Sequence, residues 1–271
     1  MDLLIVAIPA AIYLGTPLLI KFGDGMNGNP TLLPVDPAQW PASIAQTMSR
    51  VEHDLYGMGF SIVARFRMPN GASNTDTLLT MLVNYKSGDK AMITAMWGNA
   101  NGVWTLGTLY TEFSTRFEDG HCFDTMNSKT LGSFVRGAMD IKTQVPQVTE
   151  AAELWALHRF VMRQHNPSGR KIVYEMKDAE TYLRRVWREG FQEQSKFGMF
   201  TERGTHFKPT WKGAYRMTWG LMWPMKWIRE SQMQKRAQAI VAEWKGQSAS
   251  VRESAWDENK VWVKSEAPAT V

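Results

Sequence analysis

An unbroken apolar run, LLIVAIPAAIYLGTPLLI, extends from Leu3 to Ile20. A helix of this length reaches roughly 27 Å at about 1.5 Å per residue, which matches the apolar thickness of a bilayer. We therefore predict an uncleaved, single-pass membrane anchor over residues 1–22. A cleaved signal peptide and a helix buried in protein remain as alternatives. The absence of Lys or Arg before the run argues against the signal peptide. Lys21 follows it and Asp2 precedes it, which favours a cytoplasmic position for the remaining chain.

Strict alternation of apolar and polar positions dominates residues 58–126. In TLYTEFSTRF, for example, Leu109, Phe113 and Phe117 fall on one face of an extended chain, while Glu112 falls on the other. Short turns such as SGD and EDG separate the alternating runs. This pattern predicts an antiparallel meander of about five strands with one face covered.

Helical spacing of apolar residues flanks the predicted meander. It predicts helices over 41–55, 149–165 and 178–197, with Thr149 as the N-cap of the second. The order of helix, meander and helices indicates an α+β fold, with amphipathic helices near the C-terminus. The predicted parts are an anchor (1–22), a linker rich in Gly, Asn and Pro (23–40), an α+β domain (41–200), a basic Trp-rich helical segment (201–246) and a polar tail (247–271).

The sequence TWKGAYRMTWGLMWPMKWIRE, residues 210–230, is both aromatic and cationic. It holds four Trp, one Tyr and four Lys or Arg, with Glu230 as its one acid. At about 100° per residue, the aromatic and basic side chains of 212–229 fall on one face of a helix and the aliphatic ones opposite. The uncharged centre from Met217 to Met225 is too short to span a bilayer.

Two interpretations of this segment are open. In the first, the helix lies in a membrane interface, with Trp rings at headgroup depth and basic groups on lipid phosphates. In the second, the same face is an ordinary protein surface with cation–π contacts. We favour the membrane, because the N-terminal run also indicates a bilayer. The predicted membrane-interface residues are Trp211, Lys212, Tyr215, Arg216, Trp219, Trp223, Lys226, Trp227 and Arg229. A further amphipathic helix is predicted over 233–244.

Charge is unevenly distributed and agrees with this interpretation. The net charge is +5, but residues 170–236 alone carry 15 basic and 7 acidic side chains. Anionic lipid is the predicted partner; an acidic protein or nucleic acid is the alternative, although no nucleic-acid reading module is recognisable.

The sequence contains no recognisable catalytic or metal-binding motif. Cys122 is the single cysteine, so a disulfide within the chain is excluded. His158 and His165 are two helical turns apart, about 10 Å, which is too far to share one metal ion. We predict no metal and no cofactor. If a hidden enzyme site exists between the sheet and helix 149–165, the polar groups expected to line its pocket are Glu112, Arg116, His158 and His165.

The Trp-rich segment together with TRFEDG (115–120) resembles a bacterial family of membrane-associated proteins without an assigned activity. The resemblance extends over about residues 55–240 and implies a membrane location; no functional residue is carried across. The sequence therefore predicts a membrane-anchored, non-enzymatic scaffold, assembly or binding protein. A membrane-associated enzyme and nucleic-acid binding by the basic 170–236 region are the alternatives.

Overall fold

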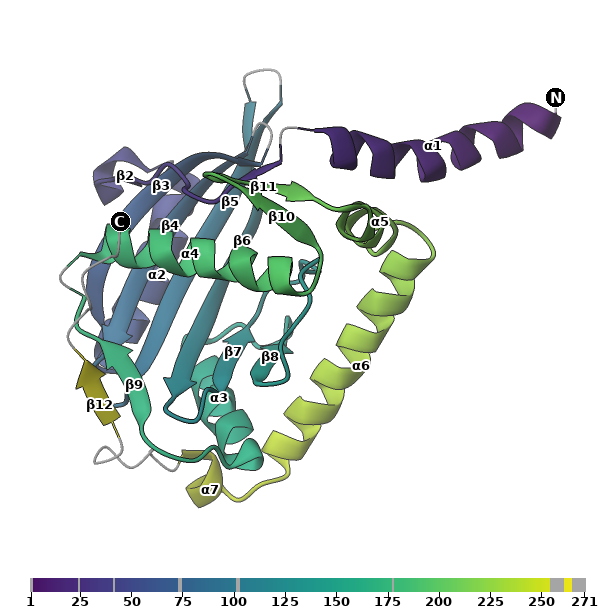
Figure 1. Cartoon of the computed structure of the whole chain (residues 1–271). Coiled ribbons are helices and arrows are strands. Elements are labelled where there is room, and N and C mark those ends of the chain that lie inside the picture. The colour runs from purple at the N-terminus through teal and green to yellow at the C-terminus, as the bar shows by residue number, and fades with distance from the viewer. Residues whose placement is uncertain are drawn as a thin grey trace. The chain divides into compact units, whose positions relative to one another are not determined.

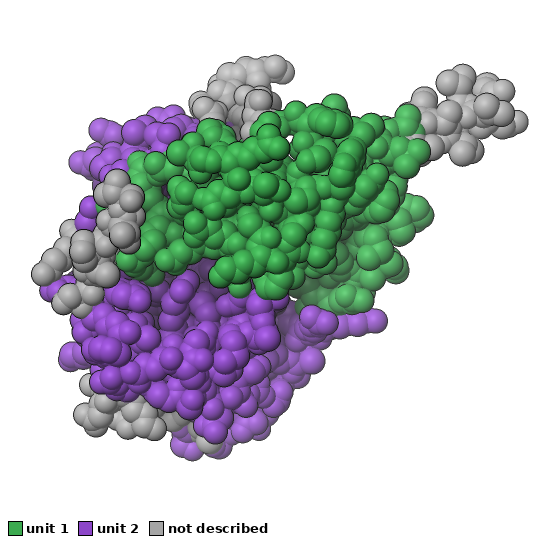
Figure 2. Space-filling model, in the orientation of Figure 1, with its two compact units in different colours: residues 1–30, 130–135, 181–233 green, residues 31–129, 136–180, 234–271 purple. Residues whose placement is uncertain are grey.

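The computed structural model divides the chain into two compact units, which are treated separately below (Figure 2). Unit 1 comprises residues 1–30, 130–135 and 181–233, and unit 2 comprises residues 31–129, 136–180 and 234–271. The structure describes residues 2–23, 25–40, 42–72, 75–100, 103–176, 178–253 and 261–264.

Unit 2 is built on a nine-stranded sheet with the order β12-β9-β6-β5-β4-β3-β2 (Figure 1). Strand β7 pairs with β6 away from this path, and β8 pairs with β7. The strands are β2 (Leu33–Pro34), β3 (Ser61–Ala72), β4 (Thr75–Asn84), β5 (Asp89–Ala100), β6 (Val103–Phe117), β7 (Cys122–Met126), β8 (Asp140–Gln144), β9 (Lys171–Tyr174) and β12 (Val261–Lys264).

The α+β class and the antiparallel sheet are confirmed. Strands β3 to β7 follow one another in antiparallel pairs, and their register places Leu82 opposite Ala91 and Phe113 opposite both Ala91 and Thr125. The sheet is larger than the five strands predicted, since β2, β8, β9 and β12 extend it. Two of its pairs, β7 with β8 and β9 with β12, are parallel. The added strands have at most five residues, too few to show a clear alternation in the sequence.

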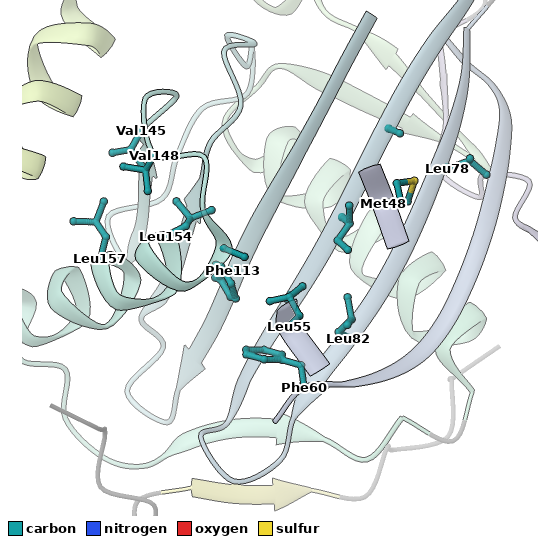
Figure 3. Close-up of a cluster of buried hydrophobic side chains, with 14 of the residues drawn as sticks. Met48, Leu55, Phe60, Leu78, Leu82, Phe113, Val145, Val148, Leu154 and Leu157 are labelled. Carbon is teal, nitrogen blue, oxygen red and sulfur yellow. The ribbon is translucent and has the colours of Figure 1, made fainter. Parts of the chain in front are cut away.

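Helices cover one face of this sheet. They are α2 (Ala42–Gly57), α3 (Ala151–His165) and the part of α6 (Met225–Lys245) that follows Met233. The 3₁₀ helix η1 (Pro37–Gln39) precedes α2, and the short α7 (Ala249–Glu253) packs against α3. Met48 and Leu55 from α2 and Leu154 and Leu157 from α3 are buried with Phe113 and its strand neighbours (Figure 3). Each such side chain contributes roughly 1.5–3 kcal/mol by leaving water.

Unit 1 contains a three-stranded antiparallel sheet and several helices. Its elements are α1 (Asp2–Phe22), β1 (Met26–Asn27), α4 (Ala179–Lys196, from Thr181 onward), β10 (Phe200–Arg203), β11 (His206–Pro209), α5 (Trp211–Trp219) and the start of α6. The sheet order is β1-β11-β10. Its core joins Phe191 of α4 to Phe200 and Phe207 of the β10–β11 hairpin. The Gln194 side chain both accepts from Val135 N and donates to Val135 O, at 2.8 Å each, which secures residues 130–135.

Gly213 allows α5 to pack closely on the loop before β10, and Gly213→Ala is expected to destabilise unit 1 by about 1–3 kcal/mol. A Cβ at this position would lie 2.0 Å from the Met199 carbonyl oxygen, and backbone must move to admit it. Gly190→Ala is the matched control, because a Cβ in this α4 position meets nothing within 4 Å. The control should leave stability unchanged or raise it by up to about 1 kcal/mol. Urea unfolding of both variants checks this, and equal stabilities would contradict the close packing.

The single helix predicted over 212–229 is wrong. The chain forms α5 to Trp219, turns, and begins α6 at Met225, which continues without interruption to Lys245 through the separately predicted 233–244 helix. Pro224 explains the break, because its ring excludes a helical residue before it and it donates no hydrogen bond. Gly220, directly after α5, adds a residue of low helix propensity.

Three smaller expectations also change. Helix α3 takes Glu150 as its N-cap residue instead of Thr149, with no side-chain capping bond. The predicted linker 23–40 holds β1, β2 and η1. The predicted polar tail 247–271 contains α7 and β12, and its residues 254–260 and 265–271 lie outside the described part of the chain.

Candidate membrane-binding surface

Helix α5 presents three aromatic rings in one row. Trp211, Tyr215 and Trp219 are spaced four residues apart, so they lie one above another on the same helix face. The ring centroids of Trp211 and Tyr215 are 6.0 Å apart, and those of Tyr215 and Trp219 are 4.5 Å apart. Gly213, Ala214 and Thr218 on the other side of the helix are buried. The aromatic face of α5 is therefore directed away from the buried side of the helix, and its three rings are 36–45% exposed.

Helix α1 continues this row. Phe22 meets Trp211 edge-on at 5.8 Å, and Tyr13 stacks on Trp219 at 6.3 Å. Two hydrogen bonds fix the pairing: Trp219 Nε1 donates to the Tyr13 carbonyl at 3.0 Å, and the Tyr13 hydroxyl donates to the Trp223 carbonyl at 2.5 Å. We call the five connected rings of Tyr13, Phe22, Trp211, Tyr215 and Trp219 the aromatic strip.

Further exposed apolar side chains lie on α1, in the turn after α5 and at the start of α6. Trp223 in the turn and Trp227 in α6 are 77% and 65% exposed, more than any other Trp in the described part of the chain. The others are Ile12, Leu14, Leu18, Leu19, Leu221 and Met225. Soluble monomers rarely expose large contiguous apolar surface, so such a surface indicates a partner or a membrane.

Basic side chains accompany this apolar surface. Lys212, Arg216 and Lys226 are exposed, and residues 211–229 contain no acidic side chain. Arg229 behaves differently from the prediction, because its guanidinium donates to the carbonyls of Gly220 at 2.7 Å and Gly132 at 2.5 Å. Burial lowers the Arg229 pKa, and the nearby charge of Arg216 lowers it further. Arg229 therefore holds the turn between α5 and α6. Lys212 donates from Nζ to the Phe197 carbonyl at 2.7 Å and Lys226 lies 3.9 Å from Glu230, yet both side chains, like Arg216, remain exposed to solvent.

The predicted transmembrane anchor over 1–22 gains no support. Across the part of the chain that the structure describes, no helix combines the length and the apolarity that crossing a membrane requires. Residues 2–22 do form helix α1, and from Ile12 onward it exposes apolar side chains next to α5.

The four candidate pocket residues do not come together. Glu112 and Arg116 alternate with Phe113 along β6, so they lie on the sheet face away from α3. His158 is buried on the α3 side, and His165 bonds through Nδ1 to the Val161 carbonyl at 2.9 Å. Burial, followed by the charge of Asp124, raises the Glu112 pKa to about 7.

His158 belongs to a buried polar chain. The Thr115 hydroxyl donates to Asp89 at 2.6 Å, so its oxygen must accept from His158 Nε2 at 2.9 Å. His158 Nδ1 then accepts from the Thr125 hydroxyl at 2.9 Å. Lys171 Nζ donates to the same Asp89 at 2.7 Å, with both side chains fully buried. Every nitrogen of the imidazole has a protein partner, so the arrangement suits a structural role within the core.

The described residues offer no evident site for metal or thiol chemistry. Among the described residues, no group of three or more His, Cys, Asp or Glu side chains is placed to hold a metal ion. Burial, reinforced by the charge of Asp124, raises the pKa of the Cys122 thiol to about 12. Such a thiol stays protonated and is a poor nucleophile.

The sequence interpretation missed Tyr13 and Phe22 as members of the aromatic strip. Both lie about 200 residues from their partners, so helical periodicity within 210–230 carried no trace of them. A weak signal was available, because Tyr13 interrupts an otherwise aliphatic run with a ring whose hydroxyl must find a partner.

No known family model matches the chain, and searches among curated proteins and solved structures find no similar protein.

Proposed function

We propose that this chain is a non-enzymatic protein that binds the surface of an anionic membrane through unit 1, with its α+β unit 2 serving as a scaffold or binding module. The observation that carries the proposal is the aromatic strip, together with exposed Trp223, Trp227, Lys212, Arg216 and Lys226 within the same segment, residues 211–229. Aromatic rings beside cations match the two layers of a membrane interface.

The energetics favour lipid as the occupant. An indole ring has an apolar body and one N–H donor, so it is stabilised at the depth where acyl chains meet headgroups. Each basic residue near an anionic leaflet adds roughly 1 kcal/mol. The cytoplasmic leaflet is the anionic one in cells, which makes it the proposed side.

Helix α1 fits the same mode of binding. Its exposed Leu14, Leu18 and Leu19 are aliphatic and lie on a helix that is packed along α5. Lys21 donates to the Pro209 carbonyl at 3.0 Å, which ties the end of α1 to strand β11. We propose that α1 and α5 lie in the plane of the interface, with their exposed side chains directed into it.

Flotation of the full chain with lipid vesicles tests this proposal. The chain should float with vesicles that contain phosphatidylserine, more weakly with pure phosphatidylcholine, and high salt should remove the difference. Trp223→Ser with Trp227→Ser should reduce partitioning about tenfold or more on both kinds of vesicle, since two rings lose apolar burial. Arg216→Gln with Lys226→Gln should cost about thirtyfold on the anionic vesicles alone.

Tyr56→Ser is the control, because Tyr56 lies in unit 2 and is 70% exposed. It should leave flotation unchanged. Flotation that is insensitive to both double variants would overturn the proposal. A failure to float combined with salt-sensitive binding to single- or double-stranded DNA would also overturn it, because the basic surface would then be a nucleic-acid-binding surface.

A further inference from the structure

A pocket of about 380 Å³ opens in unit 2, and no residue of the proposed membrane surface is among its lining residues. Its walls come from β2 and the segment that follows, and from the neighbouring strands β3, β4 and β5. The volume falls within the range that small-molecule sites occupy. Neither the aromatic strip nor the buried chain around His158 contributes to it.

The walls are mostly apolar and include two indole rings. Trp40, Leu78 and Trp97 are all buried, and they belong to the same hydrophobic cluster. The guanidinium of Arg65 lies 5.9 Å from the centre of the Trp40 ring. That guanidinium is itself held by Glu52 through bonds of 3.0 and 2.7 Å, so the Trp40 wall is fixed in place before any ligand arrives.

The pocket also contains one ion pair whose two partners do not use all of their hydrogen-bonding groups on each other. Nε and Nη2 of Arg67 both donate to Oδ2 of Asp76, at 2.8 and 2.5 Å. Because both bonds end on one oxygen, Arg67 Nη1 and Asp76 Oδ1 are not consumed by each other. The Arg67 side chain is 46% exposed while that of Asp76 is buried, so the donor end of the pair is the accessible one. The two formal charges cancel, and no other lining residue is charged.

Trp40 is only 6% exposed, and its Nε1–H is enclosed by protein. The part of this ring that reaches the pocket is therefore apolar.

We infer that this pocket binds a small, flat, uncharged molecule that combines an apolar ring with a carbonyl or similar acceptor. The ring contacts Trp40, Trp97 and Leu78. The acceptor takes a hydrogen bond from Arg67, whose side chain is 46% exposed. An anionic ligand is disfavoured because it would face the carboxylate of Asp76, and a cationic one because it would face the guanidinium of Arg67.

Ligand-observed NMR titration of the full chain tests this inference with three probes of one shape: 2-naphthamide, 2-naphthoate and 2-naphthylmethylammonium. The amide should bind, and the two charged probes should bind at least tenfold more weakly. Arg67→Leu with Asp76→Leu removes the donor without leaving a buried carboxylate unpaired, so it should weaken amide binding about fivefold. Trp223→Phe is the matched control and should leave the affinity unchanged.

Leu33→Trp keeps the test decisive if the Arg67→Leu, Asp76→Leu double variant perturbs the fold. Leu33 lines the pocket and is exposed, so a larger ring is tolerated there and should block the amide. Absence of amide binding at millimolar concentration overturns the inference. Equal affinities in the wild type and in the Leu33→Trp variant also overturn it, and tighter binding of either charged probe overturns the assigned ligand class. Vesicle binding is measured separately and has no bearing on these outcomes.

Discussion

Lys171→Met is expected to lower the free energy of unfolding by about 3–5 kcal/mol, the largest effect among the substitutions considered. Lys171 Nζ donates to Asp89 at 2.7 Å, and neither side chain is exposed. Burial alone would raise the Asp89 pKa, but the charges of Lys171 and His158 and bonds from Lys171 and Thr115 lower it to about 2. Removing the amine leaves a buried carboxylate whose remaining partners, Thr115 and Trp155, are uncharged. Urea unfolding followed by circular dichroism measures the loss.

Two further variants separate this mechanism from general damage to β9. The double variant Asp89→Asn with Lys171→Met should be more stable than Lys171→Met alone, because no unpaired charge stays buried. Arg170→Met removes the neighbouring ion pair with Glu118, whose side chains are 47% and 29% exposed, and should change stability far less. If Arg170→Met were as harmful as Lys171→Met, the burial of the pair would not be the cause.

This ion pair also shows why part of the sheet escaped sequence interpretation. Alternation predicted β3 to β7 because their inward positions are apolar or small over five residues or more. Strand β9 has four residues, and one of its inward positions is Lys171. Its partner Asp89 follows Ser87-Gly88 and reads as an ordinary turn residue. A charged residue is placed in a core by a partner that is distant in sequence, and periodicity carries no information about that partner.

The candidate membrane surface could also be predicted from the sequence only in part. Helical spacing alone predicted that Tyr215 and Trp219 share one face, since that depends on a four-residue step. The inward position of Arg229 depends on the turn after Gly220 and on Gly132, nearly 100 residues away. The place of α1 beside α5 depends on contacts across about 200 residues. Local order was therefore predictable, and the assembly of a strip from two distant helices was not.

Acidification should destabilise the chain through His158, by about 3 kcal/mol between about pH 7 and about pH 4. Burial lowers the His158 pKa from 6.5 to about 4, although the charge of Asp89 acts in the opposite direction. The unfolded chain binds a proton as the pH falls below about 6.5, while the folded chain does not until about 4. The folded state therefore loses stability over that window. His158→Gln removes the titrating group, so the wild-type stability should fall relative to this variant as the pH decreases.

The comparison with variants is necessary because titration of Glu112 changes the stability of the folded state in the opposite direction to titration of His158. Its pKa is raised from 4.5 to about 7, so the folded state binds a proton before the unfolded state does, and stability increases as the pH falls toward about 4.5. The two contributions offset each other, and the wild-type profile alone should be shallow. Urea unfolding of wild type, His158→Gln and Glu112→Gln across this window resolves them. Relative to wild type, the difference curves of the two variants should slope in opposite directions; parallel curves would show that burial does not hold His158 neutral and Glu112 protonated.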